Sequence, residues 1–481
     1  MIFSIISPFV CALVCLLLKK VADRKIKSAV VIAMQAVVTV SGVMTVLNET
    51  VTTGRFQFSD AISTGFTSDI TAKFFCIIIV FAWMLVSVYA SVYMKHEKSE
   101  EIFYLFMFLS EGAMLGAAFA DSLITMYFFY ELVSLFSMPL VLHSGGEQSV
   151  AAAKKYLFYS VAGAFCALFG IFVLSQNVAS LDFVSGAVTE NASPLVLTAV
   201  FAMCIGFGAK AGLFPLHGWL PTAHPVAPAP ASALLSGVIA KAGVLAIIRT
   251  VFFVAGPDMI KGTWVQTTLL VLSLLTVIMG SAMAHREKIF KKRLAYSTVS
   301  QISYVLTGLF LFMPEGVEGA LWQILFHAAV KVGLFLCAGA VIYLYGITNI
   351  EELDGIGKKM PVTFVCFTVL SLSLIGIPPT GGFFSKWYLA TASLASEEIG
   401  VIAWIAPVVL LISALLTAGY LLSVTIKAFW RNGSQNSSDK TVKEPLFMII
   451  PLVILSVIAL AGGIFADNVQ QLISAVAASM F

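Results

Sequence analysis

The stretch Lys210-Ala-Gly-Leu-Phe-Pro215-Leu-His-Gly-Trp-Leu-Pro221 interrupts a long apolar run of this 481-residue chain with glycine and proline, immediately after a lysine. Further prolines follow at Pro225, Pro228 and Pro230. Proline removes a backbone donor and clashes with the preceding turn of a helix. A broken membrane helix is tolerated only where the break is buried in protein or lines a wet cavity. The stretch therefore predicts an interrupted helix inside a membrane-embedded bundle.

The composition of the chain indicates an integral membrane protein. Hydrophobic residues make up 59% of the chain and charged residues only 11%, with a mean hydropathy of +0.98, whereas soluble domains carry about 25% charged residues. The seven cysteines form no CxxC pair and no haem signature, so no redox centre is expected. The sequence also lacks paired metal-ligand spacing and a glycine-rich phosphate loop after a strand, so we predict no metal, no cofactor and no ATP-driven transport. Nucleic acid is excluded as a partner.

The number of apolar runs predicts a polytopic bundle. A membrane span needs about 20 mostly apolar residues. The chain has fourteen such runs, centred near residues 10, 37, 82, 112, 132, 166, 204, 240, 274, 304, 332, 375, 413 and 456. The first run has no basic leader and no small-residue cleavage site, so we predict a span there rather than a removed signal peptide. Residues 1–481 are expected to form one transmembrane domain.

The basic residues predict the orientation of this bundle. The connections at 19–27, 95–98, 154–155, 286–293, 358–359 and 427–443 hold 20 of the 28 Lys and Arg residues. By the positive-inside rule these connections face the cytoplasm, and fourteen spans then place both termini on the outer side. We expect the protein in the cytoplasmic membrane of a prokaryote.

A second break suggests an internal repeat. The stretch Gly376-Ile-Pro-Pro379-Thr-Gly-Gly382 interrupts the twelfth run, five runs after the first break. Paired interrupted spans in corresponding positions are typical of inverted repeats with binding sites near the midplane. We therefore predict an all-α fold with two five-helix units, runs 4–8 (103–253) and runs 9–13 (264–430), which are inverted because five is odd.

Four lysines lie within or at the edge of apolar runs, at Lys210, Lys241, Lys331 and Lys386. An ionisable group at bilayer depth costs at least about 2.5 kcal/mol on insertion scales, and it usually lines an ion path or pairs with a partner. Desolvation disfavours the charged form of a lysine, so a buried lysine can release its proton near neutral pH. We predict that these lysines carry protons.

Two further ionisable residues suit this chemistry. Glu131 follows the aromatic stretch Tyr127–Tyr130 and is predicted to control the charge on Lys210; the alternative is a carboxylate satisfied by a hydroxyl within the bundle. His327 lies four residues before Lys331, so both share a helix face. Histidine suits a relay because its charge changes near neutral pH, while the alternative is a lysine that snorkels to the head groups.

Other candidates stay open between two interpretations. His217, His224 and His285 lie at predicted cytoplasmic ends of spans, where proton uptake and ordinary loop histidines both fit. Glu111 is a second acid near the middle of a span, and both bundle packing and auxiliary conduction fit it.

Six motifs lie between residues 128 and 386 of the sequence. They are Phe128-Phe-Tyr-Glu131, Lys155-Tyr-Leu-Phe-Tyr159, Leu213-Phe-Pro-Leu-His-Gly-Trp-Leu-Pro221, Arg293-Leu-Ala-Tyr-Ser-Thr-Val-Ser-Gln301, His327-Ala-Ala-Val-Lys331 and Gly381-Gly-Phe-Phe-Ser-Lys386. Together they resemble the proton-conducting antiporter-like subunits shared by respiratory complex I, Mrp multisubunit cation/proton antiporters and membrane-bound hydrogenases.

This resemblance implies three parts of a proton relay. The first is a switch pair of Glu131 and Lys210. The second is a central hydrophilic axis of Lys241, His327 and Lys331. The third is a distal proton site at Lys386. Secondary positions are Lys155, His217, His224 and Glu111. Some family members carry a glutamate at the distal site, whereas this chain is of the type that carries a lysine there. Its end near the fourteenth span is similar to the shorter, medial type of subunit.

Two functions fit these residues. In the first, the chain moves protons, with Na⁺ as a second candidate ion, as a membrane subunit of an oxidoreductase complex driven by iron-sulfur, hydrogenase or dehydrogenase subunits. In the alternative, it belongs to an Mrp-type Na⁺/H⁺ antiporter that is driven by an ion gradient and has only membrane partners. Both functions place the chain among other membrane subunits and lipid. A structural bundle with inert buried charges is disfavoured by the five intramembrane ionisable positions.

Overall fold

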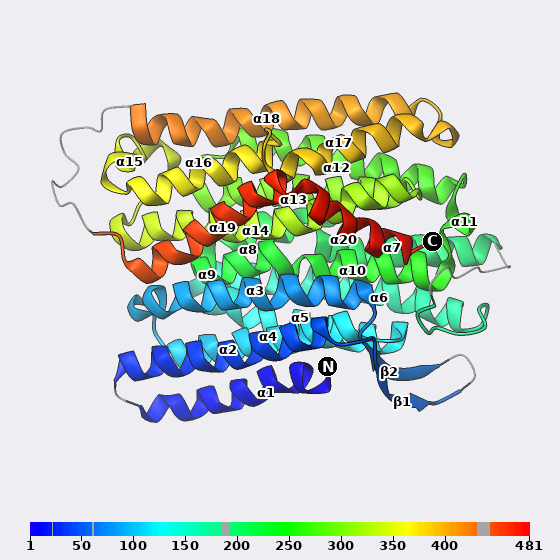
Figure 1. Cartoon of the computed structure of the whole chain (residues 1–481), viewed down its shortest axis with the longest axis horizontal. Coiled ribbons are helices and arrows are strands. Elements are labelled where there is room, and N and C mark those ends of the chain that lie inside the picture. Colours follow the sequence, from blue (N-terminus) through cyan, green and yellow to red (C-terminus); the bar gives the residue numbers. More distant parts are fainter. Residues whose placement is uncertain (22, 60–61, 185–192, 431–442) are drawn as a thin grey trace.

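The computed structural model describes residues 1–21, 23–59, 62–184, 193–430 and 443–481. Its helices run side by side along one direction and form a single bundle, with the connections gathered at the two ends (Figure 1). Within the described residues, eleven helices are long and apolar enough to cross a membrane, and Ile2–Leu17 and Pro361–Ile375 are shorter apolar helices. The predicted all-α, multi-pass membrane fold is confirmed. The count of fourteen spans and the inverted repeat of 103–253 and 264–430 stay predictions.

The helices follow one another closely along the chain. They are α1 (Ile2–Leu17), α2 (Arg24–Leu47), α3 (Ile70–Tyr93), α4 (Glu100–Phe119), α5 (Leu123–Leu142), α6 (Gly146–Ser175), α7 (Pro194–Ala211), α8 (Leu220–Val226), α9 (Ala229–Leu234), α10 (Lys241–Thr250), α11 (Pro257–Ile260), α12 (Trp264–Arg286), α13 (Phe290–Phe310), α14 (Pro314–Tyr345), α15 (Ile356–Lys359), α16 (Pro361–Ile375), α17 (Gly381–Ala395), α18 (Ile402–Trp430), α19 (Leu446–Ile464) and α20 (Ala466–Ala478).

Both predicted breaks are present. Helix α7 ends at Gly212, whose φ of 85° is left-handed and therefore suits glycine. The chain then continues through the 3₁₀ turn Leu216–Trp219 into α8. In the same way α16 ends at Gly376, with a φ of 91°, before α17 begins. A third irregularity was not predicted: the π-helical turns Leu235–Ile239 and Val251–Ala255 flank α10 on either side.

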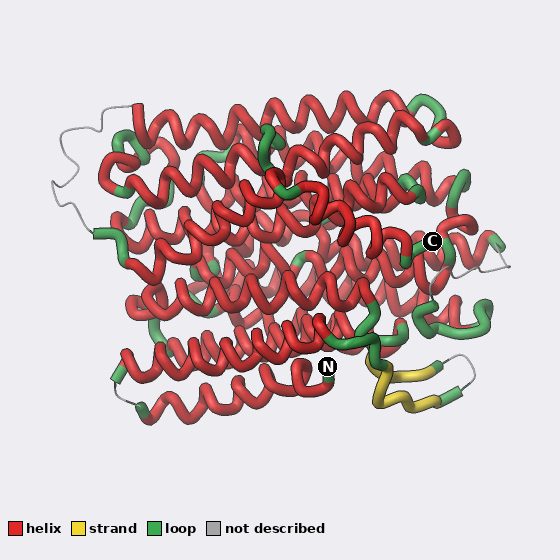
Figure 2. Tube along the Cα trace, viewed as in Figure 1, coloured by secondary structure: helices red, strands yellow, loops and turns green. Residues whose placement is uncertain are grey.

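The two ends of the bundle differ. We call one end the basic end; it holds the start of α2 and the connections after α3, α12 and α14. There Arg24, at the start of α2, donates to the carbonyl of Lys95, after α3, at 2.7 Å. Ile289, after α12, pairs with Asn349, after α14. The opposite end carries an antiparallel hairpin of β1 (Thr52–Gln57) and β2 (Ser63–Thr67), shown in yellow in Figure 2. These strands were not predicted, because their residues lie between apolar runs. That the basic end faces the cytoplasm stays a prediction.

A buried ion pair joins two helices at the hairpin end. Arg249, in the last turn of α10, is fully buried, and its guanidinium donates two hydrogen bonds to the carboxylate of Asp69, at 2.6 and 2.8 Å. Asp69 is also the N-cap of α3. Because the fork pairs both carboxylate oxygens, the contact fixes the end of α10 against α3.

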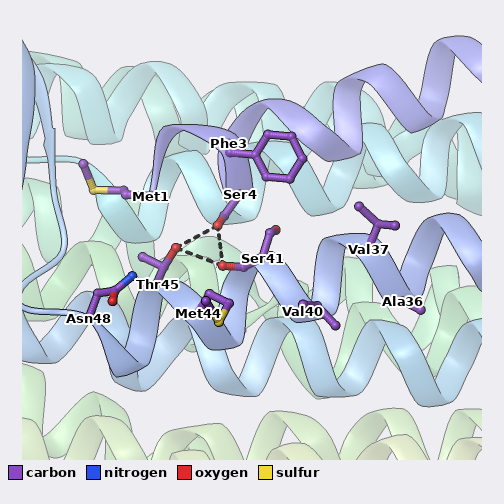
Figure 3. Close-up of a pocket in the computed structure, with 10 residues that line it drawn as sticks. All are labelled: Met1, Phe3, Ser4, Ala36, Val37, Val40, Ser41, Met44, Thr45 and Asn48. Atoms are coloured by element: carbon purple, nitrogen blue, oxygen red, sulfur yellow. Dashed lines mark hydrogen bonds between the residues drawn. The ribbon is translucent and has the colours of Figure 1, made fainter.

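A groove on the outside of the bundle lies apart from the lysines. It lies between α1 and α2, with a volume of about 530 Å³ (Figure 3). Its polar floor is formed by Ser4 and Thr45, whose hydroxyls lie 2.9 Å apart. No acidic or basic side chain is among the residues that line it, so the groove contributes no titratable side chain to the site.

Candidate functional site

Lys210 lies at the point where α7 breaks. It is the second-last residue of the helix and is fully buried. Its ammonium donates to the Ser134 hydroxyl at 2.5 Å and to the Tyr130 carbonyl at 3.2 Å, and it lies 4.2 Å from the centre of the Tyr130 ring. All of these partners are uncharged. The hydroxyl, the carbonyl and the ring face can bind the ammonium without holding it permanently in its charged form. A carboxylate in direct contact would hold it in that form.

Glu131 lies on the same stretch of α5 as the partners of Lys210. It is partly buried, and within the described part of the chain its oxygen Oε1 has no hydrogen-bond partner. The charges of Glu131 and Lys210 act on each other, and their role as a switch pair stays a prediction. Among the described residues no ion pair includes either side chain. The structure therefore places them as neighbours whose side chains are not in contact.

Lys241 and His327 form the centre of the site. Lys241 is the first residue of α10, directly after a π-helical turn, and its ammonium donates to the carbonyl of Gly237 in that turn. The same ammonium lies 3.0 Å from Nδ1 of His327 on α14. Nε2 of His327 is buried and has no hydrogen-bond partner among the residues that the structure describes. A π turn inside a helix often marks a functional position, and here it exposes a carbonyl to the lysine.

Lys331 lies one turn after His327 on α14, as predicted, but the partner of the histidine is Lys241. The fully buried Lys331 instead donates to the Leu294 carbonyl at 3.0 Å and to the Ser297 hydroxyl, both on α13. It does not snorkel to the surface. The charges of Lys241 and Lys331 both act on His327, so the three residues come together from two helices as one group.

Lys386 lies after the second break. This partly buried residue of α17 donates to the Leu374 carbonyl at 2.6 Å and to the Ile375 carbonyl. Both carbonyls belong to the last turn of α16, where a helix leaves acceptors unpaired and the dipole favours a cation. The Tyr304 ring lies 5.5 Å away. The break thus creates the binding site for the lysine that follows it.

Two glutamines lie between Lys331 and Lys386, and the sequence interpretation missed them. The Gln323 amide donates to Oε1 of Gln301 at 2.8 Å, and the Ser385 hydroxyl donates to Oε1 of Gln323 at 2.6 Å. Nε2 of Gln301 is buried, and no described residue is its hydrogen-bond partner. Gln301 follows the Lys331 ligand Ser297 by one turn, and Ser385 adjoins Lys386. The chain of amides therefore spans the gap between the two lysine sites.

The secondary candidates separate into three places. Glu111 is fully buried on α4, where Gln35 of α2 donates to Oε1 at 2.7 Å, while Oε2 has no partner in the described segments of the chain. The hydrogen bond joins Glu111 to the N-terminal helices, and no hydrogen bond joins it to the described lysines. Lys155 and His217 act on each other electrostatically near the first break. His224 is fully buried in α8, and neither ring nitrogen has a hydrogen-bond partner among the described residues, so it is not an exposed loop histidine, and its role stays a prediction.

Two cations of the predicted loop 286–293 are also buried. Helix α13 begins at Phe290, so Lys291 and Arg293 lie in its first turn, 5% and 8% exposed. Arg293 donates to the Tyr420 carbonyl at 2.8 Å. The predicted loop position was wrong because the apolar run begins only after these charges.

Across the residues that the structure describes, no group of three or more His, Cys, Asp or Glu side chains could hold a metal.

The chain is similar to known membrane proteins over most of its length. Residues 120–417 match the family model for the NADH:quinone oxidoreductase/Mrp antiporter transmembrane region. The chain is 34% identical to NADH-quinone oxidoreductase subunit N of Desulforudis audaxviator over 82% of this chain and 80% of the relative. It is 30% identical to an Na⁺/H⁺ antiporter subunit of Alkalihalophilus pseudofirmus, over 78% of this chain and 75% of the relative.

The fold is similar to a solved structure as well. A chain of the Mrp complex from Dietzia sp. DQ12-45-1b superimposes with a TM-score of 0.86, covering 100% of this chain and 98% of that chain at 22% identity. At this identity the similarity concerns the fold alone. The family match confirms the resemblance that the six motifs carry.

Proposed function

Since the chain belongs to the NADH:quinone oxidoreductase/Mrp antiporter family, we propose that it moves protons through a relay near the membrane midplane. The relay consists of Glu131, Lys210, Lys241, His327, Lys331 and Lys386. The chain acts as one membrane subunit of a larger complex, and redox partner subunits supply the energy.

The observation that carries this proposal is the set of partners of the four lysines. Within the described part of the chain, each ammonium is bound by carbonyls, hydroxyls or an imidazole, and none forms an ion pair with a carboxylate. A purely structural buried cation is usually paired with an acid, as Arg249 is. Lysines bound by neutral acceptors can be neutral or charged, which a proton carrier requires.

In the proposed mechanism, Glu131 changes the charge on Lys210 by moving towards it or away from it. At about 5 Å and an effective dielectric constant near 20, a unit pair is worth about 3 kcal/mol, which shifts a protonation equilibrium about 100-fold. The proton released by Lys210 passes to Lys241 and His327, then to Lys331 and finally to Lys386. Repulsion between successive cations drives it forward.

The glutamines between the second and third parts of this relay give a first prediction. Gln323→Leu keeps the volume of the side chain but removes both hydrogen bonds of the amide chain, so we expect proton transport by the assembled complex to fall about 10-fold or more. Amides do not titrate, so the loss would come from disordered water or misplaced hydroxyls between Lys331 and Lys386. Proton movement into vesicles, followed with a pH-sensitive dye, measures it.

A matched control is Gln266→Leu. Gln266 is equally buried on α12 and donates to the Phe310 carbonyl at 3.1 Å, outside the amide chain. The complex with Gln266→Leu should transport protons at the wild-type rate. Equal rates for the Gln323 and Gln266 variants would contradict the role of the amide chain.

The alternative function is an Mrp-type Na⁺/H⁺ antiporter driven by an ion gradient, and relatives of both kinds match the chain. To separate the two, we would purify the native complex, identify its subunits by mass spectrometry and reconstitute it in vesicles. Proton movement that requires an electron donor, with iron-sulfur or dehydrogenase subunits present, supports the redox-driven function. Proton movement driven by an imposed Na⁺ gradient, with membrane subunits only, supports the antiporter. No proton movement under either condition would refute both.

A further inference from the structure

A cavity at the basic end is lined mostly by basic side chains. It has a volume of about 310 Å³ and lies where the ends of α12 and α18 meet the start of α13 and the connection after α14. Its ionisable side chains, apart from a tyrosine, are His285, Arg286, Lys288, Arg293, Lys427 and Glu351. Four Arg and Lys residues thus accompany a single acid. The cavity therefore has an excess of positive charge, which a bound anion would neutralise.

Nearby acids do not cancel this excess. Lys288 is paired with Glu351, 2.7 Å apart. Glu287 lies close in the sequence, but it is paired with Lys292 outside the lining, at 2.8 Å. Among the ion pairs of the described residues, none includes the three other cations of the lining, which are Arg286, Arg293 and Lys427.

Arg293 is fixed in this lining by neutral oxygens. It is only 8% exposed. Its Nη1 donates to the Tyr420 carbonyl at 2.8 Å and to the Ser423 hydroxyl at 3.1 Å, and its Nε donates to the Glu287 carbonyl at 2.9 Å. These bonds do not use Nη2, so this nitrogen can donate to a bound anion. A guanidinium stays charged in proteins, and its planar set of donors suits the oxygens of a phosphate.

An exposed apolar row on α18 leads to the cavity. Helices α12 and α18 are both candidate membrane spans, and α18 forms one edge of the bundle (Figure 1). Leu411, Leu415, Gly419 and Ser423 follow one another along α18 at intervals of four residues, so neighbouring members of the row share a helix face. The last two line the cavity, whereas Leu411 and Leu415 are 62% and 66% exposed. The row connects a lipid-facing surface to a cluster of cations.

Gly419 keeps the cavity open beside His285. A Cβ atom at this position would lie 3.2 Å from Cε1 of the imidazole, closer than ordinary van der Waals contact. The backbone is helical there and its φ is not left-handed, so the conformation itself does not require glycine. The missing side chain therefore provides space where α12 and α18 meet.

We propose that this cavity binds the phosphate of an anionic phospholipid, with Arg286, Arg293 and Lys427 as its cationic partners and an acyl chain along Leu411 and Leu415. Basic pockets between membrane helices on the cytoplasmic side are typical sites for anionic head groups. The apolar row favours a lipid over a free anion, because a free phosphate would not contact it. The site goes beyond the proposed function and does not depend on it, since none of the relay residues lines the cavity.

The test measures lipid binding by the complete complex, purified in detergent and stripped of lipid. The complex is titrated with phosphatidylglycerol, which is anionic, or with phosphatidylcholine, which is zwitterionic, and the bound lipids are counted by native mass spectrometry. We expect phosphatidylglycerol to bind more tightly. The double variant Arg286→Gln/Lys427→Gln should weaken this binding at least about 10-fold, because each cation near an anionic head group contributes about 5-fold.

A second variant and a control separate the site from general attraction of charges. Gly419→Leu keeps every cation but fills the cavity, so it should lose the same phosphatidylglycerol molecule. The control is Lys25→Gln, which removes an exposed lysine in the first turn of α2, at the same end of the bundle. No ion pair of the described residues includes Lys25. The control should bind phosphatidylglycerol as the wild type does, and melting temperatures without lipid check that all variants fold.

The other outcomes overturn the site in distinct ways. If both the double variant and Gly419→Leu bind phosphatidylglycerol like the wild type, the cavity does not hold a lipid. If Lys25→Gln weakens binding as much as the double variant, the attraction is diffuse and there is no specific site. If inorganic phosphate at matched ionic strength displaces the lipid, the cavity is a site for a free anion and the assignment to a lipid is wrong. Proton transport is not measured, so none of these results bears on the proposed function.

Discussion

Replacing Lys210 with alanine is expected to lower proton transport by the assembled complex by at least about 100-fold, the usual effect of losing a proton-transfer group. Lys210 is the only relay residue whose ammonium contacts α5, through Ser134 and Tyr130, so no other described lysine can take its place beside Glu131. Assembly should be unaffected, because the groups that Lys210 contacts are neutral and the Ser134 hydroxyl still donates to the Tyr130 carbonyl within α5. Dye-monitored proton uptake in vesicles measures the transport, and the subunit content measured by mass spectrometry checks assembly.

The matched control for this substitution is Lys288→Ala. Lys288 is an exposed lysine whose ammonium lies 2.7 Å from Glu351 at the basic end, so its loss should leave transport unchanged. Glu131→Ala should reproduce the loss seen with Lys210→Ala, and the double variant should be no slower than either single variant, since the two residues act as one switch. Wild-type transport by Lys210→Ala would remove Lys210 from the mechanism.

The helix breaks and the buried lysines could be predicted because each departs locally from the apolar, helix-forming sequence expected of a membrane span. In the structure, helices end at Gly212 and Gly376. In the sequence, each of these glycines has a proline a few residues after it, and proline cannot continue an α-helix. A lysine in an apolar run stands out in the same way, because a membrane interior penalises it. These signals need no knowledge of the neighbouring helices.

The partners of the lysines could not be predicted, because they come from helices far apart in the sequence. Lys241 meets His327 across 86 residues, and Lys210 meets Ser134 across 76. Gln301 and Gln323 gave no signal because neutral amides are tolerated in a bundle at low cost. Lys291 was missed for a different reason: it was placed in the basic connection 286–293, and only the packing of α8 against α13 shows that it is buried.

Replacing Lys386 with glutamine is expected to abolish net proton transport while the fold stays stable. Lys386 binds the Leu374 and Ile375 carbonyls at the end of α16, so alanine would leave two helix-end acceptors without a donor, and a loss of activity could come from a disturbed break. The glutamine amide can donate to the same carbonyls but carries no titratable proton. We therefore expect at least about a 100-fold loss of transport, with a melting temperature of the detergent-solubilised complex close to that of the wild type.

The comparison with Lys386→Ala separates the two roles of this side chain. Alanine should lose both transport and stability, by about 1–3 kcal/mol for an acceptor left unsatisfied, whereas glutamine should lose only transport. If Lys386→Gln transports at the wild-type rate, Lys386 is a structural cap of α16 and the relay must end at another group. If it is inactive but stable, the lysine that closes the second break carries the proton, and the break serves to build its binding site at the end of a helix.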